Sequence, residues 1–71
     1  MSEFKTVMKA EKDNFVVELS RTYSEAMEGY QYCVEKYSET SYLATLESKI
    51  YKTQRGAENC YNEWVRTHIT N

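Results

Sequence analysis

Apolar and small residues in the second half of the chain recur at alternating intervals of three and four positions. These positions are Leu43, Leu46, Ile50, Thr53, Ala57, Cys60, Trp64 and Thr67. The same spacing occurs upstream at Tyr23, Ala26, Tyr30, Cys33 and Tyr37. Such spacing places side chains along one seam of an α-helix. The pattern therefore predicts two long helices whose seams face each other in an antiparallel hairpin.

The predicted fold class is all-α, with a short N-terminal helix in addition to the helical hairpin. The helices are expected at about residues 2–12, 14–37 and 41–68, with boundaries good to about 2 to 4 residues. The chain contains no Pro and only two Gly, Gly29 and Gly56, so few positions interrupt a helix. Each Gly would weaken its helix slightly, and each would let another part of the chain approach closely.

The sequence SETS, residues 38–41, is expected to connect the two long helices. A Ser or Thr side chain can accept a hydrogen bond from the first free amides of a helix, so Thr40 or Ser41 is the expected N-cap. A second start signal lies at Thr22, because Glu25 follows it at capping-box spacing.

This second signal leaves an alternative fold open. If a helix begins at Thr22, the segments on either side of Lys12, Asp13 and Asn14 can form a β-hairpin, because Val16 and Val17 favour strands. The alternative is therefore an N-terminal β-hairpin followed by two helices. Against it, Phe4, Met8, Phe15 and Leu19 match a helical face.

The 71 residues are enough for one small helical domain, residues 1–71, with a thin aliphatic core. Leu, Ile, Val and Phe make up about 17% of the chain, below the roughly 20% that indicates disorder when the net charge is also high, but the net charge here is only −2. Seven Tyr supply much of the remaining apolar surface. A core of this kind is better completed by self-association, so a homo-oligomer or coiled-coil assembly is expected.

Two tyrosines fall outside the predicted seams. Tyr32 and Tyr42 would point away from the helix-helix contact, towards a partner, a ligand or water. Tyr can bury its ring while its hydroxyl keeps a polar partner, which suits a surface that is soluble before assembly. Tyr32 and Tyr42 are therefore candidate partner-binding or ligand-binding residues.

Charge is distributed unevenly along the chain, although the net charge is only −2. Lys49, Lys52 and Arg55 form a cationic stretch, and the hairpin register would pair Lys52 with Glu28 and Arg55 with Glu25. Exposed pairs of this kind contribute about 0 to 1 kcal/mol each. A second interpretation is an anion site at Lys49, Lys52 and Arg55. Duplex DNA is excluded as a partner, because its binders usually show a broad basic face.

The sequence lacks the residue groupings that a catalytic site or a metal site requires. One His and two Cys, 27 positions apart, do not supply a structural zinc site, and no glycine-rich phosphate loop occurs. Cys33 and Cys60 are expected to be small buried thiols, because the hairpin register places them too far apart for a disulfide. We therefore predict no enzyme activity, no metal and no cofactor.

The N-terminal residues are charged and lack the apolar stretch of a signal peptide, and no window resembles a membrane span. We expect a cytoplasmic protein with no membrane partner.

The function predicted from the sequence is that of a non-enzymatic helical protein that self-associates and binds another macromolecule as an adaptor, regulator or inhibitor. The alternative is an oligomer that binds or sequesters a small anionic, nucleotide-like ligand between its subunits. A structural coiled-coil subunit of a larger assembly would use the same seams. The protein partner itself is not identified by the sequence.

Overall fold

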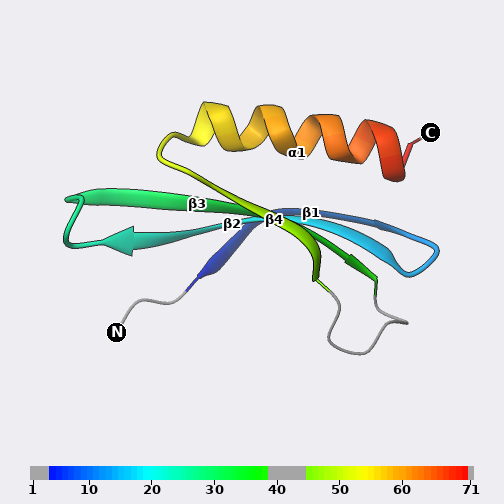
Figure 1. The fold of residues 1–71 in the computed structure, drawn as a ribbon, viewed down its shortest axis with the longest axis horizontal. Coiled ribbons are helices and arrows are strands. Elements are labelled where there is room, and N and C mark those ends of the chain that lie inside the picture. Colours follow the sequence, from blue (N-terminus) through cyan, green and yellow to red (C-terminus); the bar gives the residue numbers. More distant parts are fainter. Residues whose placement is uncertain (1–3, 39–44, 71) are drawn as a thin grey trace.

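The chain forms a four-stranded antiparallel β-sheet followed by one helix (Figure 1). The structure, a computed structural model, describes residues 4–38 and 45–70. Its elements are β1 (Lys5–Lys12), β2 (Phe15–Ser24), β3 (Gly29–Ser38), β4 (Thr45–Tyr51) and α1 (Gln54–His68). The strands lie in the order β1-β2-β3-β4, so every strand pairs with its neighbour in sequence.

This architecture contradicts the predicted all-α fold, and with it the helical hairpin and the coiled coil. The segment expected as one helix over residues 14–37 is the hairpin of β2 and β3, and the expected N-terminal helix is β1. Within the described part of the expected third helix, residues 45–68, only Gln54–His68 is helical, and Thr45–Tyr51 is a strand. Residues 5–24 do form the β-hairpin of the alternative, but only one helix follows the sheet in the described chain, so the alternative as a whole is also wrong.

The physical reason is that burying the apolar side chains of the strands lowers the free energy more than the amphipathic helices indicated by the spacing would. Val16, Val17, Leu19 and Val34 are completely buried, and the β-branched Val residues suit a pleated surface. Thr22, expected as a helix N-cap, is a buried strand residue. The expected caps at Thr40 and Ser41 lie outside the described residues.

Two short connections make the sheet possible. Asp13 and Asn14 join β1 to β2 with positive φ angles of 51° and 71°, the backbone of a two-residue type I′ turn. The β2–β3 connection is closed by a hydrogen bond of 3.2 Å from the Glu28 amide to the Glu25 carbonyl oxygen. Glu28 also has a positive φ of 53°. Asp and Asn tolerate this left-handed region well, whereas a Glu adopts it at a cost.

The helix α1 covers one face of the sheet and encloses the main hydrophobic core (Figure 1). Its buried residues follow helical spacing: Ala57, Cys60, Tyr61 and Trp64. They pack against side chains that point to the same face of β2 and β3: Val17, Leu19, Tyr32 and Val34. The sequence seam therefore identified three of the four buried residues in α1, because Ala57, Cys60 and Trp64 belong to it.

The start of α1 is set by Thr53 and Gly56. The Thr53 side chain accepts a hydrogen bond of 3.2 Å from the Gly56 amide, as an N-cap does. A Cβ at position 56 would lie only 3.1 Å from Cδ2 of Tyr51, so Gly allows the first helical turn to sit against the Tyr51 ring. The expected close approach at Gly56 is confirmed. Gly29, also expected inside a helix, is instead the first residue of β3.

The other face of the sheet has no helix over it in the described structure (Figure 1). Strand alternation places Ser20, Thr22 and Cys33 on this open face, and all three are buried. Glu18 connects three strands there, because it accepts hydrogen bonds from Thr6 Oγ1 at 2.5 Å and from the Tyr37 hydroxyl at 3.2 Å. The open face is thus partly apolar and partly polar. No helix in the described chain is long and apolar enough to cross a membrane.

We predict that Glu28→Gly stabilises the protein by about 0.5 to 1 kcal/mol, because Gly adopts a positive φ without steric cost. The measurement is urea unfolding followed by circular dichroism. Glu25→Gly is the matched control, since it removes the same charge from the same turn at a residue without positive φ, and it should lower stability. Destabilisation by both substitutions would contradict this description of the turn.

Candidate binding surface

Tyr32, expected to face a partner, lies instead in the core of its own chain. It occupies the helix-facing side of β3, next to Tyr51 of β4 and Arg21 of β2, and only 9% of it is exposed. Its ring packs within the cluster that α1 encloses. The prediction of an outward-facing Tyr32 is wrong, because strand pairing and α1 bury it without a second subunit. Tyr42 lies outside the described residues.

The three expected cations do not form one helical stripe. Lys49 is in β4, Lys52 lies in the connection to α1, and Arg55 lies in the first turn of α1. All three are exposed. Their predicted partners Glu25 and Glu28 belong to the β2–β3 connection, so the cross-helix register that paired them with Arg55 and Lys52 does not exist.

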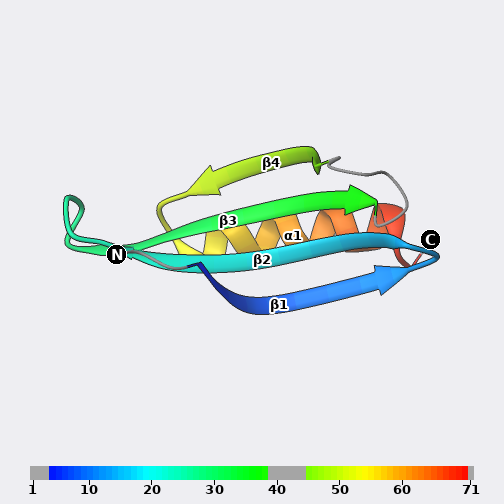
Figure 2. The same cartoon turned by 90° about the horizontal axis from the view of Figure 1, so that it is seen from below.

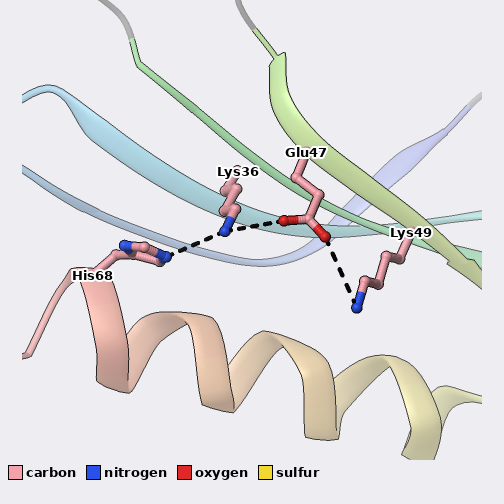
Figure 3. A network of polar contacts seen from close by, with 4 residues as sticks. All are labelled: Lys36, Glu47, Lys49 and His68. Atoms are coloured by element: carbon pink, nitrogen blue, oxygen red, sulfur yellow. Dashed lines mark hydrogen bonds and ion pairs between the residues drawn. The ribbon is translucent and has the colours of Figure 1, made fainter.

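A polar network joins β3, β4 and the end of α1 (Figure 3). The Lys36 ammonium lies 3.2 Å from Oε1 of Glu47 and 3.3 Å from Nε2 of His68. Because an ammonium only donates, Nε2 of His68 is the acceptor in this contact. Lys49 approaches the same carboxylate at 3.9 Å. The network thus attaches the C-terminal turn of α1 to β3 and β4.

Aromatic rings complete the environment of this network. The Lys36 ammonium lies 4.7 Å from the centre of the Trp64 ring, and the Lys49 ammonium lies 5.9 Å from it. His68 stacks on Phe15 with ring centres 4.8 Å apart. Lys36 is largely enclosed, with 17% of its side chain exposed. These contacts attach α1 to the sheet, and Lys49 takes part in them only loosely, with half of its side chain exposed.

A different group of side chains is both exposed and clustered. It consists of exposed Tyr23 in β2 and exposed Tyr30 in β3, the half-buried Arg21 beside Tyr30, and exposed Met27 in the turn that joins the two strands, and we call it the hairpin surface. Tyr23 and Tyr30 are cross-strand partners whose rings meet edge to face, with centres 5.7 Å apart. The Arg21 guanidinium lies 4.6 Å from the centre of the Tyr30 ring. Tyr23, Met27 and Tyr30 are 51%, 42% and 43% exposed.

The hairpin surface is exposed because the sheet is longer than its cover. The helix begins just after Tyr51, which pairs with Tyr32, whereas Tyr23 and Tyr30 lie further along the β2–β3 hairpin. Figures 1 and 2 show the tip of this hairpin projecting past the first turn of α1. The same side of the sheet that buries Tyr32 under α1 therefore presents Tyr23 and Tyr30 outside it.

The surroundings of the hairpin surface carry both signs of charge. Arg21 lies at the end nearest α1, because it pairs with Tyr32, while Glu25 and Glu28 lie in the turn at the tip, and both of these residues are exposed. The carboxylates repel a phosphate group that approaches the tip. Tyr, Met and Arg together are the residue types enriched at protein–protein contacts.

The hairpin surface was not predicted from the sequence, because the spacing of Tyr23 and Tyr30 indicated one face of a helix. A spacing of seven residues fits two turns of a helix and also fits two strand residues across a short turn. The alternation Gly-Tyr-Gln-Tyr at residues 29–32 was the available signal, since it is typical of a strand with an aromatic face.

Both cysteines are buried free thiols, as expected. Cys60 packs from α1 against the covered face of the sheet, whereas Cys33 of β3 points to the open face. Burial raises the pKa of the Cys33 thiol, and the nearby Glu35 and Glu18 carboxylates raise it further. A raised pKa keeps Cys33 protonated near neutral pH and slows its reactions as a nucleophile. Within the described residues, no group of His, Cys, Asp and Glu is arranged to hold a metal ion.

The contact between β4 and α1 makes the stability sensitive to alkaline pH. A hydrogen bond with Cys60, then burial and nearby negative charge, together raise the pKa of Tyr51 to about 12. The unfolded chain releases this proton near pH 10, before the folded chain does, so ionisation favours unfolding above that pH.

We predict that the stability of the wild type falls between pH 10 and about pH 12 and that Tyr51→Phe falls less steeply, because it has no phenol to ionise at this position. Urea unfolding across this pH range measures the slope, with Tyr23→Phe as the matched control in the exposed hairpin. Equal slopes for the wild type and Tyr51→Phe would contradict the Tyr51–Cys60 contact.

Comparisons with known proteins do not identify a relative of this chain. No protein-family model matches it, and neither a curated protein nor a solved structure does. The functional assignment therefore depends on the side chains described above.

Proposed function

We propose that this chain is a non-enzymatic binding module that recognises a protein partner through the hairpin surface. The observation that carries the proposal is the exposure of two paired tyrosines and a methionine at one place, Tyr23, Tyr30 and Met27. The role is that of an adaptor, regulator or inhibitor rather than a catalyst.

The construction of the hairpin surface supports a role in binding. Tyr23 and Tyr30 hold each other through their edge-to-face contact, and Arg21 lies against Tyr30, so these side chains are already ordered before a partner arrives. Side chains that are fixed in advance lose less conformational entropy on binding. Large aromatic and arginine side chains also contribute disproportionately to binding energy when a partner covers them.

The charges near the hairpin surface favour a protein over a nucleic acid or a nucleotide. Tyr23 and Tyr30 could stack on bases, but Glu25 and Glu28 lie at the tip where a phosphate backbone would continue. Of the expected anion-binding cations, Lys49 is engaged with Glu47. A partner with apolar side chains and an acidic group near Arg21 fits this surface better.

The test is affinity capture from a lysate of the cells that produce the protein, comparing the wild type with the double variant Tyr23→Ser/Tyr30→Ser. We expect the wild type to retain a specific protein and the double variant to lose at least about 90% of it, because two large contacts are removed. Quantitative mass spectrometry gives the readout. The substitutions remove two rings from exposed positions, and circular dichroism verifies that the variant remains folded.

Val7→Ser provides the matched control, since it removes a partly exposed apolar side chain from β1, away from the hairpin surface. It should capture the same protein as the wild type. Equal capture by the wild type and the double variant would refute the proposal. Capture of RNA or DNA that depends on Tyr23 and Tyr30 would also refute it and would favour the stacking function.

A further inference from the structure

The two edges of the sheet differ in how well they resist pairing with another strand. β1 carries a bulge between Thr6 and Met8 and three exposed lysines, Lys5, Lys9 and Lys12. Bulges and edge lysines are features by which proteins prevent edge-to-edge association. β4 is the opposite edge, and within the described residues no strand pairs with its outer side. The register of β4 also shifts, between Thr45 and Glu47, but the stretch from Glu47 to Tyr51 pairs regularly with β3. Figure 2 shows β4 at the margin of the sheet, with α1 lying behind β2 and β3 in this view.

The exposed part of β4 has a pattern that is complementary to itself. Glu47, Ser48, Lys49 and Ile50 are all exposed, and their pairing with β3 is regular. Glu47 and Lys49 point to the helix-covered face, because they lie opposite Lys36 and Val34. Ser48 and Ile50 therefore point to the open face. One acidic and one basic residue thus stand two positions apart on the same face, with Ser48 between them.

We propose that β4 pairs with β4 of a second copy of this chain, antiparallel and centred on Ser48. In this register Glu47 of each copy lies opposite Lys49 of the other, and Ser48 lies opposite Ser48 of the other. Both ion pairs form twice by symmetry, as in any isologous interface. The two sheets join into one continuous sheet, and both copies of α1 lie on the same face of it.

The symmetry of the pairing leaves few registers to compare. Residues opposite each other in an antiparallel pair share a face, so a symmetric pair of β4 strands must be centred on a residue. Centring on Glu47 places two carboxylates opposite each other, and centring on Lys49 places two ammonium groups opposite each other. Opposite charges across strands stabilise a sheet, and like charges destabilise it. Centring on Ile50 avoids both repulsions but leaves Glu47 and Lys49 without opposite charges across the interface, so Ser48 is the centre that pairs both charges.

The contacts inside one chain are compatible with this dimer. Glu47 already binds Lys36 at 3.2 Å, which fixes its carboxylate, while its contact with Lys49 is longer at 3.9 Å. Half of the Lys49 side chain is exposed, so it is able to reach a second carboxylate. The dimer does not use Tyr23 or Tyr30, and the proposal is therefore independent of the protein-binding function of the hairpin surface.

The first test measures dimerisation of the pure protein by sedimentation equilibrium. The wild type is expected to form a dimer that dissociates as salt is added, because exposed charge pairs are screened. Lys49→Glu should raise the dissociation constant about tenfold or more, since it places carboxylates opposite each other twice. The double variant Glu47→Lys/Lys49→Glu restores opposite charges across the interface and should recover most of the affinity.

The matched control is Lys52→Glu, which makes the same charge change at an exposed residue just outside β4. It should leave the dissociation constant within about twofold of the wild type. A wild type that remains monomeric at every concentration refutes the proposal. So does a dimer that tolerates Lys49→Glu, or one that the double variant does not recover although circular dichroism shows it folded like the wild type despite the loss of the Glu47–Lys36 ion pair.

A second test reports the register itself and does not depend on the charge variants. Ser48→Cys should form a cross-linked dimer rapidly under mild oxidation, because residue 48 of each copy lies opposite its equivalent. Lys52→Cys should cross-link much more slowly. The two native cysteines are buried and provide the background rate in the wild type. Equal cross-linking of Ser48→Cys and Lys52→Cys would overturn the Ser48-centred register.

Discussion

The packing of α1 against one face of the sheet is the contact on which the rest of the structure depends. A single antiparallel sheet leaves both faces in water, and a small chain gains stability only when one face is covered. Trp64, Tyr61 and Ala57 provide that cover over Leu19 and Val34. With few aliphatic residues available, aromatic rings from the helix and the sheet fill much of the core.

The end of α1 is held by charge as well as by apolar contact. Lys36 lies between Glu47 and His68 and over the Trp64 ring, so one side chain connects β3, β4 and the helix. The start of the helix is held differently, by the Thr53 cap and by the fit of Gly56 against Tyr51. Fixing both ends of α1 determines which part of the sheet is covered and which part projects beyond it.

The uncovered parts of the sheet are the places where function is proposed. The β2–β3 hairpin extends past α1 and exposes Tyr23 and Tyr30, while the outer side of β4 exposes Glu47 and Lys49. One is a cluster of apolar and aromatic side chains, and the other is a strand edge with complementary charges. Because they involve different strands, the two proposed contacts do not compete for the same residues.

The spacing of Ala57, Cys60 and Trp64 is a local property of the sequence, and it correctly predicted the face that the helix over residues 54–68 buries. The sequence also indicated a strand tendency at Val16 and Val17, although the all-α prediction set that tendency aside. The tertiary structure decided everything that depends on pairing between distant residues. Tyr23 and Tyr30, seven positions apart, could follow one another on a helix or face each other across a hairpin, and local spacing is the same in both cases. Only the burial of β2 and β3 beneath α1 selects the hairpin, and this burial encloses Tyr32 and leaves Tyr23 and Tyr30 exposed.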